Sequence, residues 1–87
     1  MPGFVYILRD LRKHYYIGST DNPDRRMYQH GLGHTKTTAR MLVPEVVLVQ
    51  EFPDLAHARK VELRLKRFKR KDFIDKIVKE GFIKLGA

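Results

Sequence analysis

The sequence contains no cysteine, no long hydrophobic run and few acidic residues. The absence of cysteine excludes disulfide bonds and thiolate metal sites, and it fits a reducing compartment. No apolar run approaches the roughly 18 residues of a membrane-spanning helix, and no basic segment followed by an apolar signal core stands at the N-terminus. We therefore expect a cytoplasmic protein that is not bound to a membrane.

The charge is strongly one-sided. Eighteen lysines and arginines face ten acidic residues, which gives a net charge of +8 and a pI near 10.1. Such an excess favours a polyanionic partner, because neutralising phosphates releases condensed counterions. Nucleic acid is the expected partner, and no partner protein is predicted. The plainer alternative is that the charge only keeps the chain soluble.

With 87 residues and 43% hydrophobic content, we expect a single domain over residues 1–87.

Two short strands are predicted near the N-terminus. Residues 4–8 are β-branched, aromatic and apolar throughout, which indicates a strand buried on both faces. Residues 15–19 follow after a short polar link, so an antiparallel hairpin centred near Leu11 is the simplest connection. That centre would place Tyr6 opposite Tyr16 on one face. Gly18 shares the face, and a glycine within a strand often marks a close approach to the backbone.

A helix is predicted to follow the second strand, over residues 23–30. Asp21 or Asn22 can cap it, Pro23 suits its first position, and Gly31 ends it. Arg26 and His30 are four residues apart and so share one face of this helix. Residues 31–43 have little periodicity and are expected to form a basic loop.

The second half of the chain predicts a strand and two helices. Residues 45–52 are bracketed by prolines and rich in valine, which suggests a buried strand. Asp54 can cap a long helix with one apolar stripe, and a last helix is expected over about residues 72–80. The order is therefore strand, strand, helix, strand, helix, helix. The apolar stripe consists of Leu55, Ala58, Val61, Leu65 and Phe68.

Glu62 projects from within this apolar stripe. A carboxylate on a core-facing surface loses hydration, so it needs a cation, a metal ion or a hydrogen-bonding partner. One interpretation is a salt bridge to Arg59 or Lys66 at helical spacing. The other is a ligand to Mg²⁺ or Mn²⁺, hard ions that take oxygen ligands from protein, phosphate and water.

The tyrosines, Arg26 and His30 also allow two interpretations. Tyr6 and Tyr16 could simply be aromatic residues packed in a sheet, Arg26 a surface arginine, and His30 a helix-end residue favoured by the dipole. In the functional interpretation, a phenol exchanges a proton with water while nearby cations stabilise its anion. Arg26 would then hold a phosphate group.

Residues 59–71 contain eight basic residues and a single acid. A run of basic residues is often only a solvated helix face. Here the interpretation as a surface that binds a nucleic-acid backbone is at least as well supported. The candidate nucleic-acid-binding residues are Lys36, Arg40, Arg59, Lys66, Arg67 and Arg70.

The two strands carry a pattern similar to the GIY-YIG nuclease superfamily. VYIL at residues 5–8 takes the place of the first motif, with Val5 where the family name has glycine and with the tyrosine kept as Tyr6. The second motif is intact as Tyr16, Ile17 and Gly18.

The rest of the pattern extends to about residue 71. Arg26, ten residues after the second tyrosine, corresponds to the catalytic arginine of the family, and His30 to its helical His or Tyr one turn later. Glu62, in ARKVELRLK, corresponds to the metal-binding glutamate. The chain most resembles the small standalone bacterial members, which are related to the nuclease domain of endonucleases that cut branched DNA.

This resemblance implies an α+β domain with a small three-stranded antiparallel sheet flanked by helices. It implies a metal-dependent endonuclease that hydrolyses phosphodiester bonds in DNA, with branched and repair intermediates as candidate substrates. Tyr16 would activate water, Tyr6 would orient water or phosphate, Arg26 would steady the scissile phosphate, and Glu62 would hold one Mg²⁺ or Mn²⁺ ion.

The C-terminal tail departs from the family pattern. Many members carry an asparagine near the end of the domain, and KEGFIKLGA has none. The alternative function is therefore a non-catalytic nucleic-acid-binding domain with a degenerate nuclease site. A protein-interaction module is a third class, in which partner binding would depend little on salt.

Overall fold

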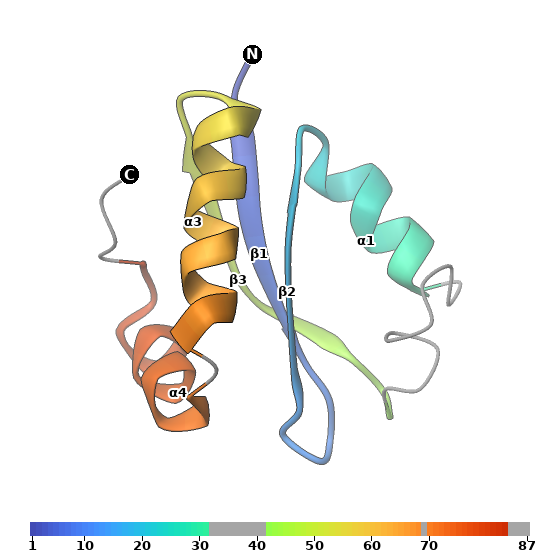
Figure 1. Cartoon of the computed structure of the whole chain (residues 1–87). Helices are drawn as coiled ribbons and strands as arrows, with labels where there is room; N and C mark the ends of the chain where they lie inside the picture. The colour runs from blue at the N-terminus through green and yellow to red at the C-terminus, as the bar shows by residue number, and fades with distance from the viewer. Residues whose placement is uncertain (32–41, 69, 84–87) are drawn as a thin grey trace.

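The computed structural model describes residues 1–31, 42–68 and 70–83. Within them it confirms the predicted order and the α+β class, with an antiparallel sheet of three strands in the order β2-β1-β3. Helix α3 lies along the sheet. Helix α1 follows the end of β2 and lies on the side of that strand away from α3 (Figure 1). The elements are β1 Gly3–Arg9, β2 Tyr15–Thr20, α1 Pro23–Gly31, β3 Glu45–Phe52, α3 Leu55–Phe68 and α4 Lys71–Glu80.

The hairpin register differs from the expected one. Tyr6 pairs with Gly18, and Tyr16 pairs with Leu8, so the expectation that Tyr6 lies opposite Tyr16 is wrong. The centre of the hairpin lies near Arg12 instead of Leu11. Because the shift moves the partner by two residues, Tyr6 and Tyr16 still share one face of the sheet.

Asp10 fixes this turn and thereby the register. Its buried carboxylate accepts hydrogen bonds from the backbone amides of Arg12 (2.9 Å), His14 (2.8 Å) and Leu42 (3.3 Å). Lys13 has a φ of 65°, a conformation that lets the chain reverse here. One side chain therefore joins the hairpin turn to the segment that precedes β3.

The core lies between one face of the sheet and α3. Val5 and Ile7 are fully buried on this face, against Ala58, Val61 and Leu65 of α3. The opposite face of β1 is also covered, since Tyr6 and Leu8 are 0% and 2% exposed. The prediction that the first strand is buried on both faces is therefore confirmed.

The third strand is less buried than its composition suggested. Val46 and Val49 are 44% and 45% exposed, so the expectation of a buried strand is wrong at these two positions. Both valines pair with β1 residues on the face that α3 does not cover, and β3 forms an edge of the described sheet. Composition cannot distinguish an edge strand from a central one.

The helix boundaries follow from local side-chain chemistry. Asn22 accepts a hydrogen bond from the Arg25 amide (3.1 Å) and caps α1, while Asp54 accepts one from the His57 amide (2.7 Å) and caps α3. Helix α4 ends at Gly81, whose φ of 85° suits a residue without a Cβ. Among the described helices, none has the length and apolarity needed to cross a membrane.

The role of Asp10 predicts a pH-dependent effect of Asp10→Asn on stability. Burial acts to raise the pKa of this carboxyl, but hydrogen bonds from the amides of His14 and Leu42 outweigh it, so the pKa lies below its usual value of 3.8. The stabilisation is thus present above pH 3.8 and is lost as the pH falls through the lower native pKa. We expect Asp10→Asn to lower the Tm at pH 7.

Thermal unfolding from pH 7 to pH 2 measures this effect, with Glu51→Gln as the control that removes an exposed carboxylate. The gap between wild type and Asp10→Asn should narrow below pH 3.8. A gap that stays constant with pH would contradict the assignment.

Candidate functional site

Gly18 makes room for the side chain of Tyr6. A Cβ atom at position 18 would lie 2.3 Å from the Tyr6 hydroxyl oxygen and 2.4 Å from the ring carbon that carries it. The close approach predicted at this glycine is thus made by Tyr6 itself. The phenol crosses the backbone of β2 and is fully buried.

Arg26 of α1 meets the Tyr6 hydroxyl. Its Nε donates a hydrogen bond to that oxygen (3.1 Å), and the Tyr6 and Tyr16 rings stack with centroids 6.2 Å apart. Burial raises the pKa of Tyr6 to about 12, partly opposed by the hydrogen bond from Arg26. The pKa of Arg26 is raised, chiefly by its hydrogen bond with Tyr6. At neutral pH, Tyr6 is therefore a neutral phenol next to a charged guanidinium.

Glu62 makes two short contacts at the edge of the apolar stripe of α3. Ser19 donates a hydrogen bond to its Oε1 (2.5 Å), and the Lys66 ammonium lies 2.6 Å from its Oε2. The side chain of Glu62 is 16% exposed. The salt bridge to Lys66 considered from the sequence is thus present, and the carboxylate points toward the hairpin.

Ser19 was not predicted as a site residue. Its signal in the sequence is its position: it is two residues after Ile17, so it shares the face that α3 covers, where a hydroxyl needs a buried partner. Identifying that partner as Glu62 required the packing of α3 on β2.

The tyrosine and arginine side chains and the Glu62 carboxylate lie on opposite sides of β2. Tyr6, Tyr16 and Arg26 lie on the α1 side of this edge strand, and Glu62 reaches Ser19 from the α3 side. A pocket of about 300 Å³ opens at this end of β2 and is lined by Arg26, Ser19 and Arg59, whereas Tyr6, Tyr16 and Glu62 are not among its lining residues. Its remaining lining residues are Thr20, Asp21, Arg25 and Leu55.

The oxygens of Glu62 and Ser19 suit a hard divalent cation. Carboxylate and hydroxyl oxygens are ligands that Mg²⁺ and Mn²⁺ prefer. Among the described residues, no three His, Asp or Glu side chains gather where they could surround an ion. Any such ion would therefore take most of its ligands from water and phosphate, which is the usual state of Mg²⁺ in phosphate-processing sites.

The other candidate residues fall in different places. Arg59 joins the pocket beside Arg26, whereas Lys66 and Arg70 line a second pocket below the hairpin. Arg67 is exposed on α3. His30 belongs to α1, but its side chain lies outside the described residues, as do Lys36 and Arg40.

Comparison with known proteins identifies the family. Residues 2–76 match the model of the GIY-YIG catalytic domain. The chain belongs to the GIY-YIG family. Its fold is similar to the solution NMR structure of a UPF0213 protein from Bacillus halodurans, with a TM-score of 0.59 and 28% identity over 93% of this chain and 87% of the other.

Two curated relatives are similar in sequence. The UPF0213 protein of Nitratidesulfovibrio vulgaris is 38% identical over 65 residues, which cover 74% of this chain and 59% of the relative. A structure-specific endonuclease subunit, SLX1 of Chaetomium globosum, is 44% identical over 69 residues, or 70% of this chain and 21% of the relative. The chain thus spans about a fifth to three fifths of these proteins. The GIY-YIG domain is a nuclease domain, and GIY-YIG nucleases are generally metal-dependent.

The contact between Gly18 and Tyr6 predicts that Gly18→Ala destabilises the fold. The added methyl group overlaps the buried phenol, so we expect a loss of about 1 to 3 kcal/mol in the free energy of unfolding. Chemical denaturation of a double-mutant cycle with Tyr6→Val measures the coupling. Gly18→Ala should cost clearly less when residue 6 is valine, and an equal cost in both backgrounds would contradict the contact.

Proposed function

We propose that this GIY-YIG domain is a metal-dependent endonuclease that hydrolyses phosphodiester bonds in DNA. The observation that carries the proposal is the pocket at the end of β2, where Arg26 and the hydroxyl that holds Glu62 line one cavity. The net charge of +8 favours a polyanionic substrate. Similarity to a structure-specific endonuclease subunit supports branched DNA as the substrate class.

In this proposal, Tyr6 and Tyr16 prepare the attacking water. Arg26 donates to the Tyr6 oxygen, and Tyr6 also makes a side-chain hydrogen bond with Tyr16, in which the neutral Tyr6 hydroxyl would be the donor. In the proposed step, Tyr16 gives its own phenolic proton to solvent, and the resulting phenolate accepts the proton of the attacking water as general base.

Arg26 serves the phosphate side of the reaction. Its Nε is anchored on Tyr6 while the residue lines the pocket, so the guanidinium is held in one place beside the scissile group. The water oxygen forms a bond to phosphorus as the bond to the leaving sugar oxygen breaks. A fixed positive charge stabilises the extra negative charge that develops on the phosphate oxygens.

Glu62 and Ser19 are the residues that would hold the divalent ion. The ion, when bound, would stabilise the negative charge on the leaving oxygen. Lys66 occupies Oε2 of Glu62, and its side chain is 50% exposed, so it has solvent-filled space into which to move. A cation at Glu62 must therefore compete with this lysine.

The same ion pair favours the second candidate function, a nucleic-acid-binding domain without catalysis. If Lys66 remained paired with Glu62, the carboxylate would stay neutralised and would not bind a divalent ion. The basic surface would then bind nucleic acid without cleavage. This candidate predicts salt-sensitive DNA binding without cleavage by any divalent ion.

Cleavage assays on plasmid and branched DNA with Mg²⁺ or Mn²⁺ test the proposed site. We expect Tyr16→Phe, Arg26→Ala and Glu62→Gln each to lower the rate about 100-fold or more, the size seen when a transition-state contact is removed. Removal of divalent ions with EDTA should abolish cleavage. Glu51→Gln, an exposed carboxylate on β3, is the matched control and should leave the rate unchanged.

Unchanged cleavage in all three site variants would reject the site. A wild-type protein that binds DNA in a salt-sensitive way but cuts none of these substrates with either ion would support the non-catalytic candidate instead.

The contact between Lys66 and Glu62 predicts that Lys66→Met strengthens metal binding. Removing the competing ammonium should tighten the Kd for Mn²⁺ about two- to fivefold, the range expected for a partly exposed ion pair. Calorimetric titration without DNA measures this directly, and Lys60→Met on the same helix controls for the loss of charge. Equal Mn²⁺ affinity in the two variants would show that Lys66 does not compete.

A further inference from the structure

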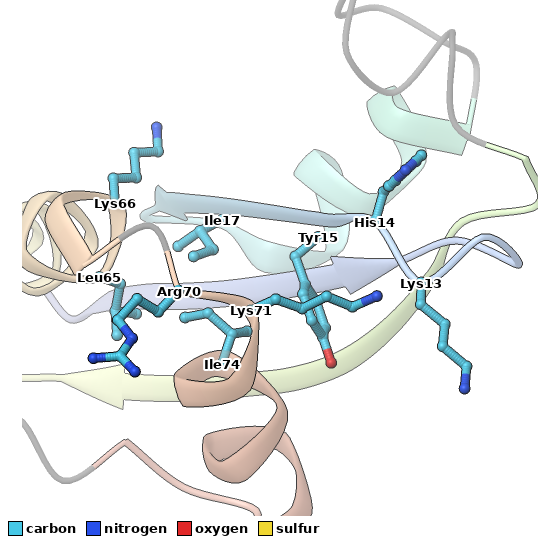
Figure 2. Close-up of a pocket in the computed structure, with 9 residues that line it drawn as sticks. All are labelled: Lys13, His14, Tyr15, Ile17, Leu65, Lys66, Arg70, Lys71 and Ile74. Carbon is cyan, nitrogen blue, oxygen red and sulfur yellow. The ribbon is translucent and has the colours of Figure 1, made fainter.

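A second pocket, of about 350 Å³, lies between the turn end of the hairpin and helices α3 and α4. Its apolar floor consists of Ile17, Leu65 and Ile74, which converge from β2, α3 and α4 (Figure 2). This pocket is separate from the one that Arg26 lines, with which it shares no residue. The proposed hydrolysis assigns it no role.

The rim of this pocket is basic. Lys13 from the hairpin turn and Lys71 at the start of α4 stand at its edges (Figure 2), together with His14, Lys66 and Arg70. No carboxylate occurs among the described residues that line it. Arg70 is paired with Asp72 at 3.3 Å and Lys66 with Glu62 at 2.6 Å, so Lys13 and Lys71 are the more available cations of the rim. An apolar floor with a cationic rim complements a ligand that has an apolar body and attached phosphates.

Tyr15 adds an aromatic wall. Its ring lies among the residues around the pocket (Figure 2), and its hydroxyl donates a hydrogen bond to Asp75 of α4. Burial and this hydrogen bond raise the pKa of Tyr15, so the phenol is neutral at physiological pH. A neutral aromatic ring anchored at its far end is a suitable surface for stacking a nucleobase.

We propose that this pocket holds one unpaired base of the DNA substrate, with the adjoining phosphates on Lys13 and Lys71. This inference rests on the proposed function and adds a preference for DNA with an unpaired nucleotide. A base inside a duplex must first be unstacked and unpaired, which costs free energy, whereas a base at a bulge or junction is already exposed. The pocket therefore favours disrupted DNA over a continuous duplex.

The pocket is close enough to the proposed cleavage site to act on the same DNA. Lys66 lines it and also contacts Glu62, one helical turn earlier on α3. Four residues of α-helix rise about 6 Å. A base held here would therefore lie about one helical turn from Glu62, the proposed site of the divalent ion.

Fluorescence anisotropy in EDTA, where DNA is not cut, tests the proposal. Three labelled DNAs are compared: a continuous duplex, the same duplex with one unpaired adenosine, and the same bulge with an abasic site. We expect the unpaired adenosine to bind about tenfold more tightly than the other two, the effect of stacking one base. Binding of the abasic bulge as tight as the adenosine bulge would overturn the proposal.

Two variants test whether the preference for the unpaired base arises in this pocket. Lys71→Glu on the rim and Ile17→Trp, which fills the floor, should each abolish the preference for the unpaired base. Lys79→Glu makes the same charge change at the other end of α4, outside the pocket, and should keep the preference. Because Lys71 is exposed, its variant is informative even if Ile17→Trp fails to fold.

The outcomes separate the two proposals. Equal affinity for all three DNAs, in a protein that still cleaves DNA with a divalent ion, would overturn the base pocket and leave the nuclease assignment intact. Absence of binding to every DNA would reject both.

Discussion

The hydrogen bond from Arg26 to the buried hydroxyl of Tyr6 is the interaction on which the proposed site depends. It joins α1 to the central strand of the sheet and fixes a guanidinium at the pocket wall. The phenol can reach Arg26 only because Gly18 leaves space above the backbone of β2. A side chain at that position would force the ring away and release the arginine from its anchor.

Strand β2 carries residues of the proposed site on both of its faces. Gly18 and Tyr16 face α1, whereas Ser19 faces α3 and holds Glu62. Because β2 is an edge strand of the described sheet, side chains from the two helices can approach each other around its end. Arg26 thus lines a pocket together with Ser19, and Ser19 links β2 to Glu62.

The sequence predicted the elements, the caps and the residues near the site, because periodicity and capping are local. It did not predict the register of the hairpin, which depends on the hydrogen bonds that Asp10 accepts from the amides of Arg12, His14 and Leu42. It overestimated the burial of Val46 and Val49, because strand order decides which valines are covered. Glu62 was a candidate from the sequence, but its contact with Ser19 was not predicted, because that contact depends on how α3 packs.

The most direct test of this account is where a divalent ion binds. Addition of Mn²⁺ during solution NMR broadens the signals of amides close to the ion. If Glu62 holds the ion, the amide signals of Ser19 and Glu62 broaden first, and that of Arg26 across the pocket broadens next. Broadening centred instead on the exposed carboxylates of α4, such as Asp72 and Asp75, with Ser19 and Glu62 unaffected, would contradict it.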